Sequence, residues 1–146
     1  MSEGRLDPIE FDFPPQPRFL RSLRNQLRHA LGERGVAEDT TDVVLLVVDE
    51  IVSNAIEHAT DYRSGAANLS LRVAAAPERV SVEFVDPEVP DELVAELQQR
   101  VADSRNGPPP LDSERGRGLF LITEHFGEVR IDRAADGGLH LRGDLA

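Results

Sequence analysis

The chain of 146 residues lacks both cysteine and lysine, and all sixteen of its basic residues are arginine. The absence of cysteine excludes disulfides and thiolate metal sites. The absence of lysine excludes a Schiff-base lysine and the lysine of a P-loop. Beyond these exclusions the absence of lysine carries no functional weight, because the codon bias of a GC-rich genome explains an arginine-only chain and also its abundant alanine, glycine, proline and valine.

Long apolar runs are absent too, and the first residues lack the basic-then-apolar pattern of a signal peptide. We therefore expect a soluble cytoplasmic protein of one domain, with no membrane partner. The formal net charge of −11 argues against direct binding to nucleic acid. Such a charge is compatible with a protein that handles phosphates locally, through a metal and backbone groups.

Hydrophobic periodicity predicts an α+β fold, a two-layer sandwich in which a mixed, mostly antiparallel sheet carries helices on one face. Residues 1–17 form a Pro-rich extension with an edge-strand pattern, and residues 18–146 form the single domain. The expected helices cover residues 18–34, 39–59, 92–102 and 118–126, and the expected strands lie near 69–73, 80–85, 129–131 and 139–141. The helix over 39–59 takes its caps from residues 39–42. Residues 103–117 read as a loop long enough to be functional.

Three polar side chains, Glu50, Asn54 and His58, recur every fourth residue within the helix expected over 39–59. This spacing places them along one helical stripe. Glu50 falls at the edge of the apolar arc and is a candidate general base. Asn54 offers a neutral oxygen to a hard cation such as Mg²⁺. His58 lies deeper in the arc and reads as a packed histidine; ordinary boundary polarity is the alternative reading for the other two.

A second candidate site is the run Arg115-Gly116-Arg117-Gly118-Leu119, between the long loop and the helix expected over 118–126. Glycine N–H groups at a helix N-terminus form a cradle for phosphate, and the two arginines add positive charge. A flexible hinge is the alternative reading. A third candidate is Asp86, at the end of a predicted strand, where a carboxylate accepts a hydrogen bond from an exocyclic amine such as that of adenine. An ordinary turn-starting aspartate is its alternative.

These elements, in this order, resemble the Bergerat-fold ATP-binding domain of the GHKL superfamily. Within it, the chain resembles the bacterial anti-sigma-factor serine/threonine kinases of partner-switching systems. The segment from Asp49 to Ala59 is similar to the N box of that family, and Gly116 to Ile122 is similar to its second glycine box.

The resemblance implies a kinase that binds ATP and Mg²⁺, with the metal held through Asn54 and with Glu50 as the base that activates a partner's serine. Asp86 would read adenine, residues 115–119 would contact the nucleotide, and residues 87–115 would form a lid over the phosphates. The implied partners are a sigma factor, which the kinase sequesters, and a STAS-domain antagonist, which it phosphorylates. A homodimer is also common in the resembling family, and the helix near residues 19–31 has apolar surface for one.

The sequence departs from the family at the first glycine box, where Glu88 and Pro90 replace both glycines that follow the aspartate. The last glycine box is also an incomplete match, because Gly137-Gly138 precedes a leucine where family members often have threonine or serine. These departures support an alternative function, in which the same fold sequesters a protein partner with weak nucleotide binding and no kinase activity.

Overall fold

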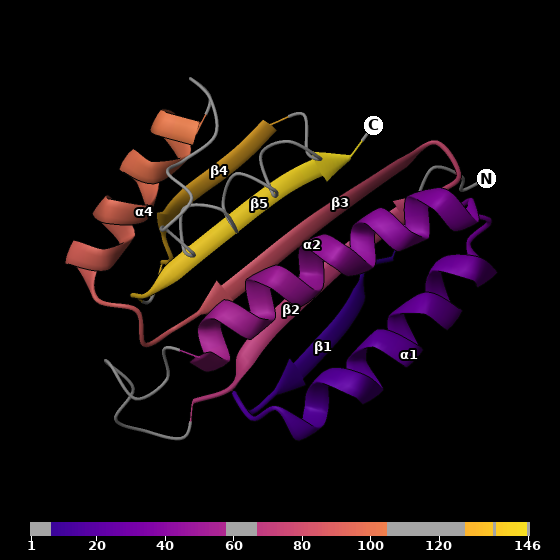
Figure 1. Cartoon of the computed structure of the whole chain (residues 1–146), viewed down its shortest axis with the longest axis horizontal. Coiled ribbons are helices and arrows are strands. Elements are labelled where there is room, and N and C mark those ends of the chain that lie inside the picture. The colour runs from indigo at the N-terminus through magenta and orange to yellow at the C-terminus, as the bar shows by residue number, and fades with distance from the viewer. Residues whose placement is uncertain (1–6, 58–66, 105–127, 136, 146) are drawn as a thin grey trace.

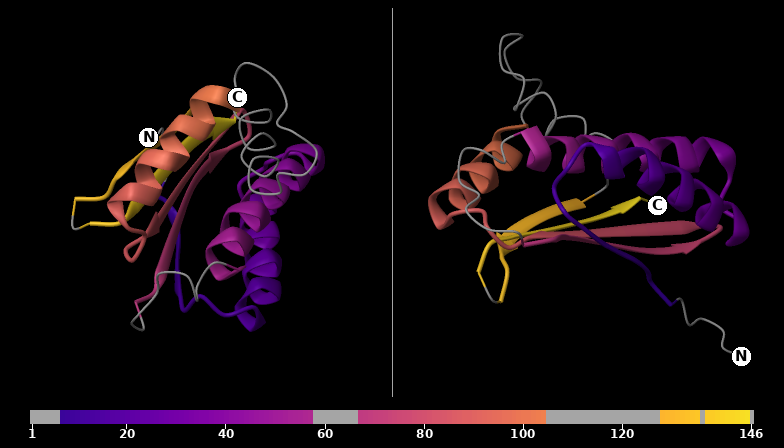
Figure 2. Two further views of the ribbon diagram at one scale, coloured as in Figure 1. Left: turned by 60° about the vertical axis from the view of Figure 1, so that its left-hand side comes forward. Right: turned by 90° about the horizontal axis from the view of Figure 1, so that it is seen from below.

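A computed structural model describes residues 7–57, 67–104, 128–135 and 137–145. Within these ranges five strands form one sheet in the order β1-β2-β3-β5-β4, and every neighbouring pair is antiparallel. The strands are β1 (Ile9–Phe13), β2 (Leu69–Ala76), β3 (Arg79–Asp86), β4 (Glu128–Arg133) and β5 (Leu139–Leu145). The helices α1 (Arg18–Glu33), α2 (Glu38–Glu57) and α4 (Asp91–Ser104) lie on one side of the sheet (Figures 1 and 2). The predicted α+β two-layer fold is confirmed.

The core lies between the helices and the inner face of the sheet. Alternate residues of β2 and β3 point into it, and Leu71, Val73, Val82 and Phe84 are at most 1% exposed. Helix α2 supplies a broad aliphatic face that includes Val44, Val48 and Val52, all buried. Burial of this face at roughly 25 cal/mol per Å² is the main force that holds α2 on the sheet.

The outer face of the sheet is polar and carries no helix within the described residues. Polar contacts between side chains link four strands there: Arg72 forms ion pairs 3.3 Å from Glu10 and 3.9 Å from Glu83. The same Glu83 lies 2.7 Å from Nε2 of His140. Because this face is solvated and charged, the apolar core occupies only the helix side of the sheet.

Helix α1 ends where the sequence offers a glycine. Gly35 has a φ of +78°, a conformation that favours glycine. The N–H of Val36 reaches back to the carbonyl of Leu31 at 3.1 Å, and Val36 itself is buried. This pattern of a left-handed residue and a long backward hydrogen bond is typical of a Schellman end.

Two helix starts differ from the prediction. Helix α2 begins at Glu38 rather than after the caps expected at residues 39–42, since the carbonyl of Ala37 already accepts from the N–H of Thr41 at 2.9 Å. The acidic residues Glu38 and Asp39 thus fall in the first turn, where their negative charges interact favourably with the helix dipole. Helix α4 begins at Asp91 because the carbonyl of Pro90 accepts from the N–H groups of Leu93 and Val94.

Two helical leucines test the packing of this core. Leu27 on α1 is fully buried, whereas Leu46 on α2 is 47% exposed. We expect Leu27→Ala to lower the free energy of unfolding by about 2–5 kcal/mol, through lost burial and the cavity left behind. Leu46→Ala is the matched control and should change it by less than about 0.5 kcal/mol. Urea unfolding of both variants measures this, and equal losses would contradict the assigned packing.

Candidate functional site

The C-terminal half of α2 and the end of β3 lie at the same end of the molecule (Figures 1 and 2). Glu50 and Asn54 belong to that half of α2, and both are half-buried at the boundary of its apolar face. Asp86 is the last residue of β3. The fold therefore gathers these three predicted site residues at one end of the helix–sheet layer, although they come from segments far apart in the chain.

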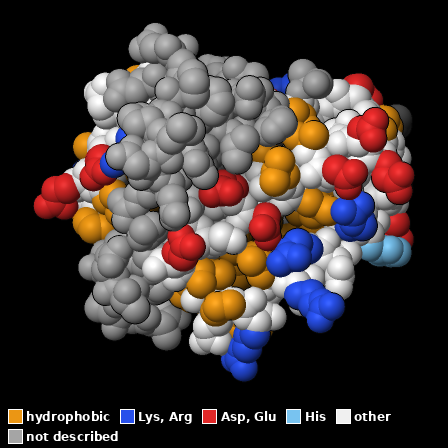
Figure 3. All heavy atoms as spheres, in the orientation of Figure 1, with side chains coloured by type: hydrophobic (Ala, Val, Ile, Leu, Met, Phe, Trp, Pro, Cys, Tyr) orange, Lys and Arg blue, Asp and Glu red, His pale blue; other side chains and the backbone are white. Residues whose placement is uncertain are grey.

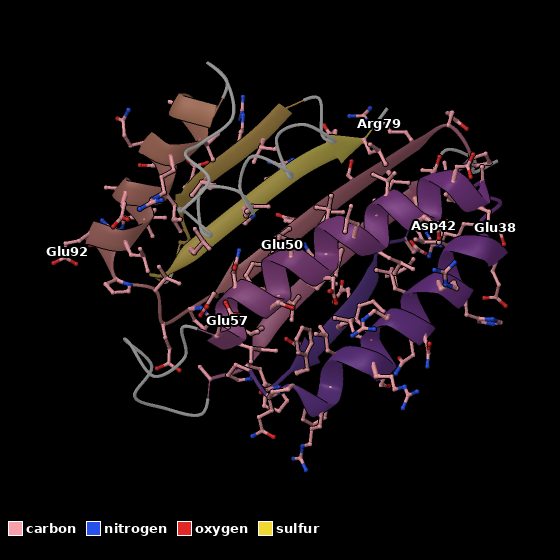
Figure 4. All side chains as sticks on the ribbon, viewed as in Figure 1. Glu38, Asp42, Glu50, Glu57, Arg79 and Glu92 are labelled. Atoms are coloured by element: carbon pink, nitrogen blue, oxygen red, sulfur yellow. The ribbon has the colours of Figure 1, made fainter. Side chains whose placement is uncertain are left out.

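Glu50 stands in an environment that disfavours its ionised form. Partial burial raises its pKa above the ordinary value for glutamate, and the neighbouring carboxylates of Asp49 and Glu57 raise the pKa further. Glu50 and Glu57 both project from the C-terminal half of α2 (Figure 4). Acidic side chains are spread along α2 in the space-filling view, while arginines lie over α1 (Figure 3). A carboxylate with a raised pKa holds a proton more strongly than a free one does, as a general base must.

Asp49, which contributes to that shift, is itself tied to the neighbouring helix. Nε of Arg24 on α1 lies 3.0 Å from Oδ1 of Asp49, an oxygen that is covered from solvent. A second ion pair, between Arg28 and Asp42 at 3.1 Å, joins the same two helices nearer the start of α2. Sequence reasoning missed Arg24, because its partner lies on a different helix and no local spacing links the two.

Asp86 is the one carboxylate of the described residues that is fully buried. Its Oδ1 accepts a hydrogen bond from the backbone N–H of Glu88 at 3.2 Å. Such a bond from a side chain to the N–H two residues on holds the chain in a tight turn directly after β3. Because water does not compete with a buried acceptor, a donor that reaches this carboxylate is bound strongly.

The segment after Asp86, which lacks the two family glycines, is held by packing and by backbone hydrogen bonds. Val89 enters the core at 4% exposure, and the carbonyl of Pro90 receives the first hydrogen bonds of α4. Glu88 is half-buried, and its backbone N–H is the group that binds Asp86. The replacements at Glu88 and Pro90 therefore take part in a defined strand-to-helix connection.

A glycine of the β4–β5 turn lies against this connection. Gly138 has a φ of +95°, is buried, and packs directly on the backbone of Asp86 and Pro87. The sequence indicated only a tight turn at residues 136–138. The signal that would have found the contact is the pairing of Leu139 with Asp86, which requires the order of strands in the sheet.

The other predicted site residues lie outside the described part of the chain. These are Arg115, Gly116, Arg117, Gly118 and Leu119, whose roles remain predictions. His58, which the sequence indicates as a packed histidine and not as a site residue, lies outside the described part as well. The lid expected over residues 87–115 also remains a prediction. Within it, residues 91–104 form α4, and Gln98 of this helix donates to the carbonyl of Ile131 on β4 at 2.7 Å.

The described residues contain no group of three or more His, Asp or Glu side chains that would hold a metal ion by themselves. Asn54 supplies a single neutral oxygen at the boundary of α2. This donor set fits a cation such as Mg²⁺, which keeps several waters and takes its remaining ligands from phosphate oxygens. In the described ranges no helix is long and apolar enough to cross a membrane.

Comparison with known proteins supports the resemblance drawn from the sequence. The family model of the histidine kinase-like ATPase domain matches residues 13–142. The serine-protein kinase RsbW of Bacillus subtilis is 26% identical over 143 residues, covering 88% of this chain and 80% of that protein. The enzyme of the same name from Bacillus licheniformis is 24% identical over 127 residues, covering 86% of this chain and 78% of that protein.

Solved structures share the fold at low sequence identity. One is the SiaB–SiaC complex of Pseudomonas aeruginosa, with a TM-score of 0.75, 16% identity, and coverage of 94% of this chain and 88% of the matched chain. Another contains the RsbU and RsbW domains of Rv1364c from Mycobacterium tuberculosis. Its TM-score is 0.59 at 18% identity, and the match covers 95% of this chain but 31% of that longer one.

The raised pKa of Glu50 predicts a stability that depends on pH. The folded state favours the protonated carboxyl more than the unfolded chain does, so stability is lost as pH rises through the raised pKa. We expect Glu50→Gln to raise the melting temperature at pH 7, and this gain to shrink as the pH falls toward 4. Glu78→Gln removes the same charge from an exposed turn and serves as the control. Melting curves from pH 4 to 8 measure both, and a variant less stable than the wild type at pH 7 would contradict the assignment.

Proposed function

We propose, because this chain belongs to the family of histidine kinase-like ATPase domains, that it is an ATP-binding serine/threonine protein kinase of the anti-sigma-factor type. The observation that carries the proposal is the environment and position of the Glu50 side chain. Its carboxylate is half-buried, has a raised pKa, and stands on the same helix as Asn54, at the end of the molecule where Asp86 ends β3.

Each described site residue has a role that its chemistry supports. Asn54 would contribute its side-chain oxygen to the Mg²⁺ that accompanies the nucleotide. Asp86 would accept a hydrogen bond from the exocyclic amine of adenine, because its buried carboxylate favours a donor over water. From the sequence alone, Arg115, Gly116, Arg117, Gly118 and Leu119 would contact the phosphates.

Bound Mg²⁺–ATP would supply the phosphoryl group, whose bond to ADP breaks as a bond to the partner's serine oxygen forms. The chain's own contribution is to hold a proton acceptor in place. A carboxylate oxygen of Glu50 accepts the hydroxyl proton of the serine, and the raised pKa of Glu50 makes that oxygen a better acceptor than an ordinary glutamate. The pairing of Arg24 with Asp49 limits how far the adjacent carboxylate opposes this ionised state.

The proposed partners rest on the family resemblance of the sequence rather than on this chain's surface. Its curated relatives are named as serine-protein kinases, and one structural neighbour was solved as a SiaB–SiaC complex. We propose a sigma factor as the sequestered protein, a STAS-domain antagonist as the phosphorylated one, and the cytoplasm as the compartment. A homodimer stays a prediction.

The alternative function is a sequestering module that does not transfer phosphate. It is favoured by Glu88, whose half-buried acidic side chain follows Asp86 at a position where the family has glycine. Negative charge there opposes the binding of a polyanionic nucleotide.

Titration with Mg²⁺–ATP separates the two functions. A ligand that binds only the folded state raises the melting temperature, by roughly 5–10 °C at a concentration about 100 times Kd for a domain of this size. We expect such a shift with Mg²⁺–ATP and a smaller one with ATP in EDTA. No shift at millimolar Mg²⁺–ATP would rule out the kinase and leave the sequestering module.

The role of Glu50 is tested by separating binding from transfer. Glu50→Ala should keep the thermal shift with Mg²⁺–ATP and should lower phosphate transfer to the antagonist by about 10²–10⁴-fold, the usual contribution of a general base. Glu78→Ala is the matched control and should leave both unchanged. Radiolabelled transfer assays measure this, and full transfer by Glu50→Ala would show that another group is the base.

A further inference from the structure

Among the glycines that the structure describes, Gly138 in the turn between β4 and β5 makes the closest approach to another backbone segment. A Cβ built on this residue would lie 2.5 Å from Cα of Pro87, 2.7 Å from its carbonyl carbon, and closer still to the carbonyl oxygen of Asp86. All three are backbone atoms. A side chain at position 138 is therefore accommodated only if one of the two backbone segments moves.

Gly137 provides an internal comparison for this contact. It has a φ of +97°, nearly the same as the +95° of Gly138, so an L-amino acid is strained at both positions. A Cβ on Gly137, however, would meet no atom of the described residues within 4 Å, its own chain neighbours aside. The two glycines thus share the same backbone requirement and differ in what lies beside them.

Neither segment at the contact moves freely. The turn is closed by two hydrogen bonds, from the N–H of Ala134 to the carbonyl of Gly138 at 2.9 Å and from the N–H of Gly137 to the carbonyl of Ala134 at 3.0 Å. On the other side, Asp86 pairs with Leu139 of β5, its carboxylate accepts from the N–H of Glu88, and Pro87 restricts the chain directly after it. A displacement of this segment is therefore transmitted to the carboxylate of Asp86.

We propose that Gly138 is the positioning residue for Asp86, and that the absence of a side chain at position 138 sets the preference of the site for adenine. This inference rests on the proposed function, in which Asp86 binds the exocyclic amine. The close backbone approach at Asp86 is thus provided by a glycine next to the neighbouring strand β5, while Glu88 and Pro90 stand where the family has glycines. Gly138 itself need not touch the nucleotide.

The test compares Gly138→Ala with Gly137→Ala in the full chain, using Mg²⁺–ATP and Mg²⁺–GTP as probes. GTP carries an oxygen where ATP carries the amine. The dissociation constant for GTP divided by that for ATP, called the ratio below, therefore reports on the Asp86 contact. Calorimetric or thermal-shift titration gives both constants. We expect Gly137→Ala to lower the melting temperature but keep the ratio, and Gly138→Ala to reduce the ratio by about tenfold or more, as for a displaced hydrogen bond to a charged group.

A double-mutant cycle shows whether the effect passes through Asp86. In an Asp86→Ala background, which removes both acceptor oxygens, Gly138→Ala should change the affinity for ATP by less than about twofold, because the contact it displaces is already lost. A full additional loss in that background would overturn the inference. So would a Gly138→Ala protein that keeps the wild-type ratio.

A second variant keeps the test decisive if Gly138→Ala does not fold. Pro87→Gly loosens the same contact from the Asp86 side and leaves Gly138 in place, and it too should reduce the ratio. An unchanged ratio in Pro87→Gly would overturn the inference. If the wild-type protein binds neither nucleotide, the proposed function is overturned and this inference with it. If the wild type prefers ATP but the variants leave the ratio unchanged, only this inference is overturned.

Discussion

The packing of α2 against the central strands is the interaction on which the rest of the structure depends. Strand β3 lies in the middle of the sheet, hydrogen-bonded to β2 on one side and β5 on the other, and its inward side chains Val80, Val82 and Phe84 are buried. The valines of α2 cover the same face. This burial fixes where α2 stands relative to the end of β3, and so fixes Glu50 and Asn54 relative to Asp86.

The same packing explains why the site residues are only half-buried. An apolar arc that covers the sheet must have edges, and the residues at those edges are neither in the core nor fully in water. Glu50 stands at such an edge, where burial and two neighbouring carboxylates act together on its proton affinity. A fully exposed glutamate would lack this effect, whereas deeper burial would oppose ionisation more strongly. The ion pair between Arg24 and Asp49 then links this balance to α1.

Much of this arrangement could be predicted from the sequence because it depends on local periodicity. The 3.6-residue repeat predicted α1 and α2, the alternation of apolar residues predicted β2 and β3, and the helical wheel predicted the boundary positions of Glu50 and Asn54. What could not be predicted depends on contacts between distant segments. Nothing local indicates that β5 lies between β3 and β4, that Arg24 reaches Asp49, or that Gly138 meets Pro87. The start of α2 was placed too late because polar residues at 39–42 resemble caps, although the carbonyl of Ala37 already opens the helix.

The β4–β5 turn also bears on how this protein can change in length. Surface hairpins normally accept added residues, since an insertion there disturbs only solvent-exposed backbone. This turn is different, because its last residue packs on the backbone of Asp86 and Pro87 and its own hydrogen bonds close at Ala134. An inserted residue would remove the glycine from its contact even if every original residue were kept. The contact therefore constrains the number of residues in this hairpin. Although the turn lies at the edge of the molecule, its length is fixed as that of a core segment would be.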